Sequence, residues 1–157
     1  MIQPIEPIRR ETVVPASQQR AFETFTERIT DWWPSRHHIG SADIEQVIIE
    51  PRAGGRWYTR HVDGTETSTG VVVAWEPPER LVVTWQISAD WKFDPSLVTT
   101  VEVRFEEQGP DRTRVRLEHR DLERYGPDAE RMHETFDGPG AWAGTLAAFA
   151  GALEPVR

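Results

Sequence analysis

Apolar residues recur at helical spacing near the C-terminus. Trp142, Leu146, Phe149 and Leu153 follow one another at intervals of three or four residues and form one stripe of a predicted helix. Residues 138–153 include no charged side chain. A helix without a polar face is normally buried, and the run is shorter than the roughly 20 apolar residues of a membrane span. The pattern therefore predicts a helix enclosed by the rest of the fold, with its large side chains facing a core or a cavity.

The first 34 residues predict one strand followed by a helix. Residues 8–14 form the strand, which ends before Pro15, and Ser17 is suited to cap the helix that follows. Pro34, after a helical turn, prevents a long continuation. The apolar face of this helix is formed by Ala21, Phe22, Phe25 and Ile29.

Short strands separated by turn signals fill the middle of the chain. The connections between these strands are short, which favours an antiparallel meander. The first and third strands show no clear alternation of apolar and polar residues. A short helix or ordered loop at 126–136 separates the meander from the final helix. This order predicts an α+β fold, in which a strongly curved sheet wraps the final helix and leaves a cavity between them. The predicted strands of the meander are residues 43–50, 56–61, 67–75, 80–87, 97–107 and 112–120.

Composition narrows the class of protein. A length of 157 residues predicts a single domain, 1–157, with a real core. The net charge of −8 argues against nucleic acid or an anionic membrane as the main partner. The absence of cysteine excludes disulfides and a cysteine nucleophile. The N-terminal residues contain no apolar signal core, so we expect a cytoplasmic protein.

Tryptophan is unusually frequent, with seven residues against two tyrosines. Tryptophan often lines interfaces and ligand pockets. Strand alternation places Trp57, Trp85, Phe105 and His119 on inward faces. Apolar walls with a few polar groups are typical of a small-molecule pocket, but large aromatic side chains also fill ordinary cores. A filled core and a ligand cavity therefore both remain open.

His119 is the most informative polar candidate, because it is in phase with Val115 and Leu117 on its strand. Its imidazole is suited to anchor a ligand or to act as a general base, and the alternative is a core histidine hydrogen-bonded to backbone or water. The pattern favours a pocket-lining role. His37 and His38 are interpreted as polar loop residues, with a metal site built from the histidines as the alternative. No glycine-rich phosphate loop is present, and Met132-His133-Glu134-Thr135 lacks the second histidine of a zinc-protease helix. We therefore expect no cofactor and no metal.

Several motifs resemble a known family. The motifs are Val14-Pro15-Ala16, Asp31-Trp32-Trp33-Pro34, Glu50-Pro51-Arg52-Ala53-Gly54-Gly55-Arg56-Trp57, Gly70-Val71-Val72, Trp75-Glu76-Pro77-Pro78-Glu79-Arg80-Leu81, Thr84-Trp85, Leu117-Glu118-His119-Arg120 and Gly138-Pro139-Gly140-Ala141-Trp142. On these motifs, residues 8–154 resemble the START-like (SRPBCC) superfamily, and within it the branch similar to the C-terminal domain of activators of the heat-shock-protein-90 ATPase.

The resemblance implies a helix-grip fold. In this fold a curved antiparallel sheet of about seven strands wraps around a long C-terminal helix, and a short helical pair follows the first strand. A cavity lies between sheet and helix. Many relatives bind lipids, polyketides or other apolar molecules there, and some are cyclases or aromatases.

Three functional hypotheses follow. The leading one is non-enzymatic binding of a small apolar or aromatic ligand in the cavity. The second is a cyclase or dehydratase that uses the same cavity, with His119 as acid and base. The third is a co-chaperone-like interaction module with an apolar surface patch that includes Trp32, Trp91 and Phe93. Independently of these hypotheses, a homodimer is possible, because exposed edge strands can pair with those of a second copy. The ligand-binding residues predicted for the first hypothesis are Trp33, Trp57, Trp85, Phe105, His119, Met132, Trp142 and Phe149.

Overall fold

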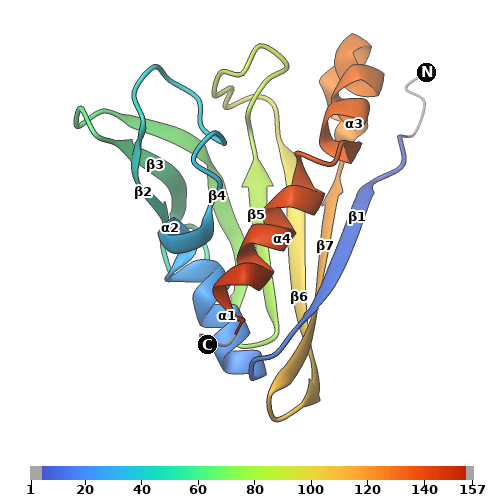
Figure 1. Cartoon of the computed structure of the whole chain (residues 1–157). Helices are drawn as coiled ribbons and strands as arrows, with labels where there is room; N and C mark the ends of the chain where they lie inside the picture. The colour runs from blue at the N-terminus through green and yellow to red at the C-terminus, as the bar shows by residue number, and fades with distance from the viewer. Residues whose placement is uncertain (1–4, 155–157) are drawn as a thin grey trace.

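A curled antiparallel sheet forms the body of the molecule, and helices cover part of its concave side (Figure 1). The computed structural model describes residues 5–154. The seven strands lie in the order β1-β7-β6-β5-β4-β3-β2, so all neighbours except β1 and β7 are consecutive in the chain. The strands are β1 (Ile8–Val14), β2 (Ile44–Ile49), β3 (Arg56–His61), β4 (Glu66–Glu76), β5 (Arg80–Trp85), β6 (Thr99–Gly109) and β7 (Arg112–Arg120).

The helices lie before and after the meander. The side chain of Ser17 caps the first of them by accepting a hydrogen bond from the backbone N–H of Arg20 at 3.2 Å, as predicted. None of the helices within residues 5–154 is long and apolar enough to cross a bilayer. The helices are α1 (Gln18–Thr26), α2 (Ile29–Trp32), the 3-10 helix η1 (Leu122–Asp128), α3 (Ala129–Asp137) and α4 (Trp142–Ala152).

The predicted α+β fold, the antiparallel meander and the helical pair after the first strand are confirmed. The largest difference lies between β5 and β6, where the sequence predicted strands up to 87 and from 97. The strands instead stop at Trp85 and resume at Thr99. The intervening loop forms its own hydrogen bond, from the N–H of Asp94 to the carbonyl of Gln86 at 2.8 Å. This local pairing takes the place of the β5–β6 ladder, which ends at the pair Trp85 and Thr99.

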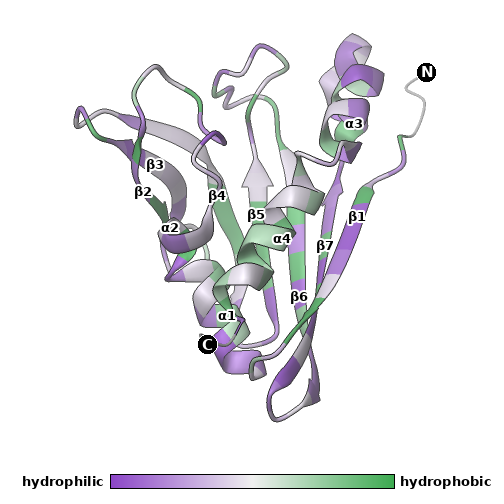
Figure 2. Ribbon diagram, viewed as in Figure 1, coloured by the Kyte–Doolittle hydropathy of each residue, from purple (hydrophilic) through white to green (hydrophobic). Residues whose placement is uncertain are grey.

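The final helix, α4, lies across the concave side of the sheet. Its predicted stripe of large side chains is buried, and Phe149 is completely inaccessible. The prediction of full enclosure was wrong for the outer face, where Ala147, Gly151 and Ala152 are exposed. Small side chains present little apolar area to water, so exposure of this face costs little free energy. Figure 2 shows the resulting contrast between weakly apolar α4 and the alternating strands behind it.

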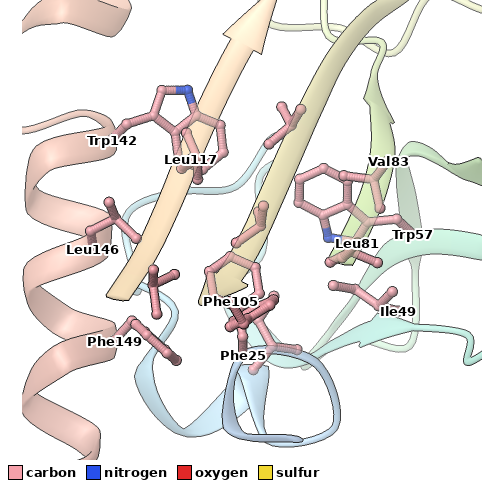
Figure 3. Close-up of a cluster of buried hydrophobic side chains, with 14 of the residues drawn as sticks. Phe25, Ile49, Trp57, Leu81, Val83, Phe105, Leu117, Trp142, Leu146 and Phe149 are labelled. Atoms are coloured by element: carbon pink, nitrogen blue, oxygen red, sulfur yellow. The ribbon is translucent and has the colours of Figure 1, made fainter. Parts of the chain in front are cut away.

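One end of the concave space is filled by aromatic side chains (Figure 3). The Phe149 ring contacts Phe25 at 5.2 Å and Trp32 at 5.3 Å between centroids, both edge to face. Phe105 contacts Phe22 at 5.2 Å in the same way. Such pairs add about 0.5–1.5 kcal/mol each beyond their burial. The sequence left both a filled core and a ligand cavity possible, and at this end of the concave space the core is filled.

Two bulges, both in β4, curl the other half of the sheet. The first has Thr69 as its extra residue, because Trp57 and Tyr58 of β3 pair with Gly70 and Ser68. The second has Val73, because Val72 and Ala74 pair with the consecutive residues Val83 and Val82 of β5. A Cβ atom on Gly70 would lie 2.0 Å from the carbonyl oxygen of Thr84, so only glycine allows this close approach. Bulges increase strand twist and bend. The β2–β4 half therefore curls round toward α4 (Figure 1).

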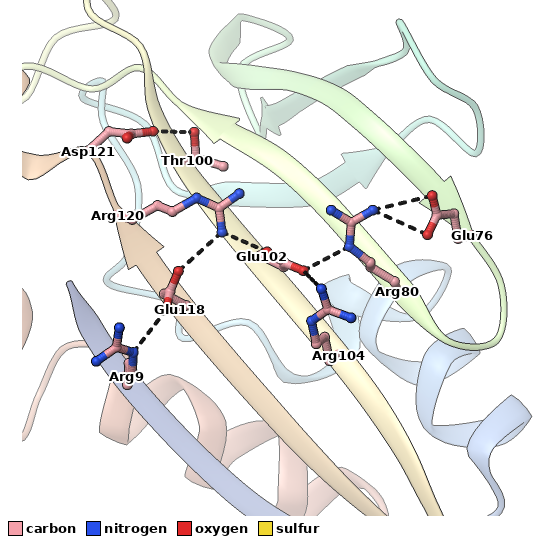
Figure 4. Close-up of polar contacts among 9 residues, drawn as sticks. All are labelled: Arg9, Glu76, Arg80, Thr100, Glu102, Arg104, Glu118, Arg120 and Asp121. Carbon is pink, nitrogen blue, oxygen red and sulfur yellow. Dashed lines mark hydrogen bonds and ion pairs between the residues drawn. The ribbon is translucent and has the colours of Figure 1, made fainter.

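Ion pairs cover the convex face of the sheet (Figure 4). Glu102 accepts from Arg80 at 2.8 Å, Arg104 at 2.8 Å and Arg120 at 2.6 Å. Burial alone would raise the pKa of Glu102, but the hydrogen bonds from Arg80 and Arg120 outweigh it and lower the pKa below its usual range. This charged layer keeps the convex face solvated.

Candidate functional site

A pocket of about 420 Å³ occupies the open end of the concave face. Its volume falls within the range of about 300–1,000 Å³ typical of small-molecule sites. Four parts of the fold meet there: the loop after α2, the curled strands β2–β5, the loop after β5, and the segment joining α3 to α4. The lining residues are Trp33, Arg36, His37, His38, Ile39, Val47, Trp57, Thr59, Thr67, Thr69, Trp85, Ile87, Trp91, Thr135, Phe136, Gly138, Gly140, Ala141, Trp142 and Thr145.

Four indoles form a closed set around this pocket, here called the tryptophan cluster: Trp33, Trp57, Trp85 and Trp142. Neighbouring members lie 5.7–6.3 Å apart between centroids, and their planes cross at 61–87°. Edge-to-face packing is the arrangement that the ring quadrupoles prefer. Because the rings meet at steep angles instead of stacking, they span the gap between α4 and the curled strands without filling it.

His119 fixes one member of the cluster through a hydrogen bond. The indole N–H of Trp142 donates to His119 Nδ1 at 3.0 Å. The hydroxyl of Thr99 donates to the carbonyl of Trp85 at 2.7 Å, so its oxygen accepts from His119 Nε2–H at 2.8 Å. The neutral imidazole with its proton on Nε2 satisfies every group in this chain. Both ring nitrogens are therefore used within the protein, and His119 acts on the pocket through Trp142.

Burial lowers the pKa of His119 to about 3, because its imidazole is completely desolvated. A second proton would also have to enter at Nδ1, where the Trp142 N–H already donates. His119 is consequently neutral at physiological pH, and its hydrogen-bond pattern does not change with pH in that range.

The loop after α2 brings polar side chains to the pocket. The His37 imidazole donates from Nε2 to the carbonyl of Gly140 at 3.1 Å, and its Nδ1 lies 3.3 Å from the hydroxyl of Thr145. Desolvation lowers the pKa of His37, although the bond to Gly140 opposes the shift. His37 is therefore neutral near pH 7, with Nδ1 as an acceptor. Arg36 stands beside it, exposed at the rim.

Threonines from the curled strands supply a second polar wall. Thr59 on β3 pairs in register with Thr67 on β4, and Thr69 follows on the same face of β4. His61 ties this wall to the loop before β2: its Nε2 meets the hydroxyl of Thr67 at 2.8 Å and its Nδ1 meets the carbonyl of Ala42 at 2.8 Å. The wall is thus held by a buried histidine and carries hydroxyl groups suited to hydrogen-bond a ligand.

Trp91 lies at the rim, on the loop between β5 and β6. It is 49% exposed and has a φ of 61°, in the left-handed region that a bulky residue rarely occupies. Such a conformation costs about 1–3 kcal/mol and persists only where its surroundings impose it. The loop is held by the Ile87–Phe93 bridge, which keeps the Trp91 indole at the mouth of the pocket.

The eight predicted site residues divide into two groups. Trp33, Trp57, Trp85 and Trp142 line the pocket. Phe105, His119, Met132 and Phe149 are buried behind or away from it, each at most 2% exposed. Alternation gives the inward face of a strand but not the position of a pocket along that face. Contact of either group with a ligand stays a prediction.

Sequence reasoning missed the loop residues of the site. His37 and His38 were interpreted as polar loop residues, and Arg36 was given no role. Loop positions carry no periodic signal that would turn them toward the pocket. Within residues 5–154, no group of three or more His, Cys, Asp or Glu side chains is placed to hold a metal ion. The surface patch predicted for the interaction module was wrong in one residue, because Trp32 is 6% exposed and its indole donates to the carbonyl of Thr24 at 2.7 Å.

Replacement of His119 by glutamine tests its role. Glutamine offers one acceptor and one donor, so both hydrogen bonds are retained while the titrating group is lost. The wild-type protein is expected to lose stability as the pH falls from about 6.5 toward 3, because the unfolded state takes up the proton that the folded state refuses. Urea unfolding at pH 7.5 and pH 5 gives the free energy of unfolding at each pH. The decrease from pH 7.5 to pH 5 is expected to be smaller in His119→Gln than in wild type by about 2 kcal/mol.

His133→Gln, which removes a histidine from the surface of α3, is the matched control and is expected to keep the wild-type dependence. Equal acid sensitivity in His119→Gln and in wild type would contradict the neutral, buried state of His119. His119→Ala is expected to cost about 2–4 kcal/mol at both pH values, because it opens a cavity and leaves the Trp142 N–H unpaired.

Comparison with known proteins agrees with this geometry. Residues 15–153 match the family model described as activator of Hsp90 ATPase homolog 1-like protein. Among solved structures, the anthrahydroquino-Gama-pyrone synthase Txn09, solved in complex with SUM, is 39% identical, with a TM-score of 0.66 over 94% of this chain and 97% of that one. The self-sacrificing resistance protein CalC from Micromonospora echinospora is 26% identical, with a TM-score of 0.71 over 94% and 93% of the two chains.

A more distant match has the same fold. CalU16, also from Micromonospora echinospora, is 21% identical, with a TM-score of 0.63 over 96% of this chain and 77% of that one. No curated protein matches the chain. The match of the family model to nearly the whole chain, together with the helix-grip architecture, establishes that the protein belongs to the activator of Hsp90 ATPase homolog 1-like family of SRPBCC-type proteins.

Proposed function

We propose that the protein binds a small, planar aromatic molecule in the pocket of the concave face. The observation that carries this proposal is the tryptophan cluster, whose four indoles line a space of about 420 Å³ without filling it. Aromatic walls offer a ring-shaped ligand a large apolar contact area. Each aromatic contact adds about 0.5–1.5 kcal/mol beyond the burial of its surface.

Polar groups near the aromatic walls suit a ligand that carries oxygen atoms. Neutral His37 presents an acceptor at Nδ1, and the threonine wall presents hydroxyl groups. A few fixed polar groups in an otherwise apolar pocket orient a ligand and reject molecules that leave them unpaired. A hydroxylated or keto-substituted aromatic system meets both requirements, whereas a saturated lipid chain satisfies only the apolar one.

The name of one relative supports the same class of ligand. The Txn09 synthase is named for an anthrahydroquino-Gama-pyrone, a fused aromatic system with oxygen substituents, and it is 39% identical to this chain over nearly its whole length. We therefore take oxygenated polycyclic aromatic compounds as the first ligand class to test.

Filling the pocket without removing a core residue tests the proposal. Thr69→Phe places a ring in the pocket from β4, while Val73→Phe adds the same ring on the outer face of that strand, where Val73 is 54% exposed. In calorimetric titrations with 1-hydroxyanthraquinone, we expect binding by wild type and Val73→Phe and at least a tenfold loss of affinity in Thr69→Phe.

Thermal unfolding without ligand shows whether each variant is folded. Equal affinity of folded Thr69→Phe and wild type would place binding outside the pocket. An absence of binding by ligand-free wild-type protein, to 1-hydroxyanthraquinone and to a panel of flavonoids and other hydroxylated aromatic compounds, would contradict the proposal.

A second candidate function is ring closure of a bound aromatic ketone. The 39% identity to a protein named as a synthase favours it. His37 is the base that we assign, because its Nδ1 lies at the pocket wall beside the hydroxyl of Thr145, and that hydroxyl donates to the carbonyl of Ala141 at 3.1 Å. Both nitrogens of His119, in contrast, are used in hydrogen bonds within the protein. In such a step His37 removes the proton of a phenol, the oxygen adds to an unsaturated carbon, and the proton is returned to the neighbouring carbon.

The cyclisation of 2′-hydroxychalcone to flavanone is a simple probe, because substrate and product are isomers with different absorbance. An enzyme is expected to convert the chalcone faster than buffer alone does. This rate is expected to fall at least 100-fold in His37→Gln and to stay unchanged in His133→Gln. Binding of the chalcone without any acceleration would leave the protein as a binder of this compound and contradict the cyclase role for it.

A further inference from the structure

The charges around the pocket differ from those of the whole chain. The chain carries 26 acidic residues against 18 basic ones. Among the side chains within residues 5–154 that line the pocket, however, none is an aspartate or glutamate, and Arg36, His37 and His38 gather on one loop at its edge. The surroundings of a bound ligand are therefore neutral or positive in a protein whose net charge is −8.

Arg36 has no carboxylate partner in the part of the chain that the structure describes. Several arginines on the convex face are ion-paired, as Arg80 is to Glu102 at 2.8 Å and Arg9 is to Glu118 at 2.9 Å. The Arg36 side chain instead lies at the pocket rim, exposed and without an ion pair. A guanidinium group has five N–H donors in a planar fork that matches a carboxylate.

We propose that the pocket prefers aromatic acids. The aromatic system of the ligand contacts the tryptophan cluster, and its carboxylate or ionised phenol meets Arg36 at the rim. This inference rests on the proposed function and adds the charge of the ligand to it. Aromatic faces attract cations, but an ammonium group in this pocket would be repelled by Arg36 and would find no carboxylate among the lining residues to pair with.

Three anthraquinones that differ only at position 2 test the preference: the carboxylate, the carboxamide and the aminomethyl compound. Calorimetry at pH 7 is expected to give about tenfold tighter binding of the carboxylate than of the carboxamide, and the weakest binding for the aminomethyl compound. In Arg36→Gln the advantage of the carboxylate is expected to shrink to twofold or less, because the carboxylate loses more affinity than the carboxamide.

Arg20→Gln is the matched control. It changes the net charge by the same amount from an exposed position on α1, outside the pocket, and is expected to keep the full preference. Equal binding of carboxylate and carboxamide by wild type, tighter binding of the aminomethyl compound, or an equal loss in both arginine variants would overturn the inference and leave the proposed function standing. Failure of all three compounds to bind would overturn both.

Discussion

The structure depends on the burial of one helix face. The large side chains of α4 have to leave water, and the concave side of the curled sheet is the surface that receives them. Near its C-terminal end, α4 meets α1 and α2 closely, and Phe25, Phe105 and Phe149 fill the space. Near its N-terminal end, the β2–β4 half of the sheet curls across at a greater distance. There the gap is spanned by tryptophans, and the same packing that makes a core at one end makes a pocket at the other.

A buried hydrogen-bond chain couples this packing to the site. Trp142 donates to His119, His119 to Thr99, and Thr99 to the carbonyl of Trp85. Two members of the tryptophan cluster, one on the helix and one on the sheet, are thus connected through a single neutral imidazole. Unpaired buried polar groups cost about 1–3 kcal/mol each, so the chain holds only in this arrangement. A rigid aromatic wall is what a binder of planar ligands needs, because little conformational entropy is lost on binding.

The sequence predicted the elements of this fold better than the site within it. Periodicity predicted the stripe of α4, the cap at Ser17 and the inward faces of Trp57 and Trp85, since these follow from local geometry. It did not separate Phe105 from Trp85, because both point inward and only the distance between sheet and helix distinguishes core from pocket. The residues Arg36 and His37 were out of reach for another reason: the conformation of their loop is set by tertiary contacts such as the bond from His37 to Gly140.

The most direct test of the central claim uses the seven tryptophans as internal probes. The indole N–H signals in a ¹H–¹⁵N spectrum, assigned by single Trp→Phe variants, are followed during titration with 1-hydroxyanthraquinone. Binding in the pocket is expected to shift the signals of Trp33, Trp57, Trp85, Trp91 and Trp142, which line it, and to leave those of Trp32 and Trp75 in place. Shifts confined to Trp32 and Trp75, or to the rim residue Trp91 alone, would contradict a ligand site within the tryptophan cluster.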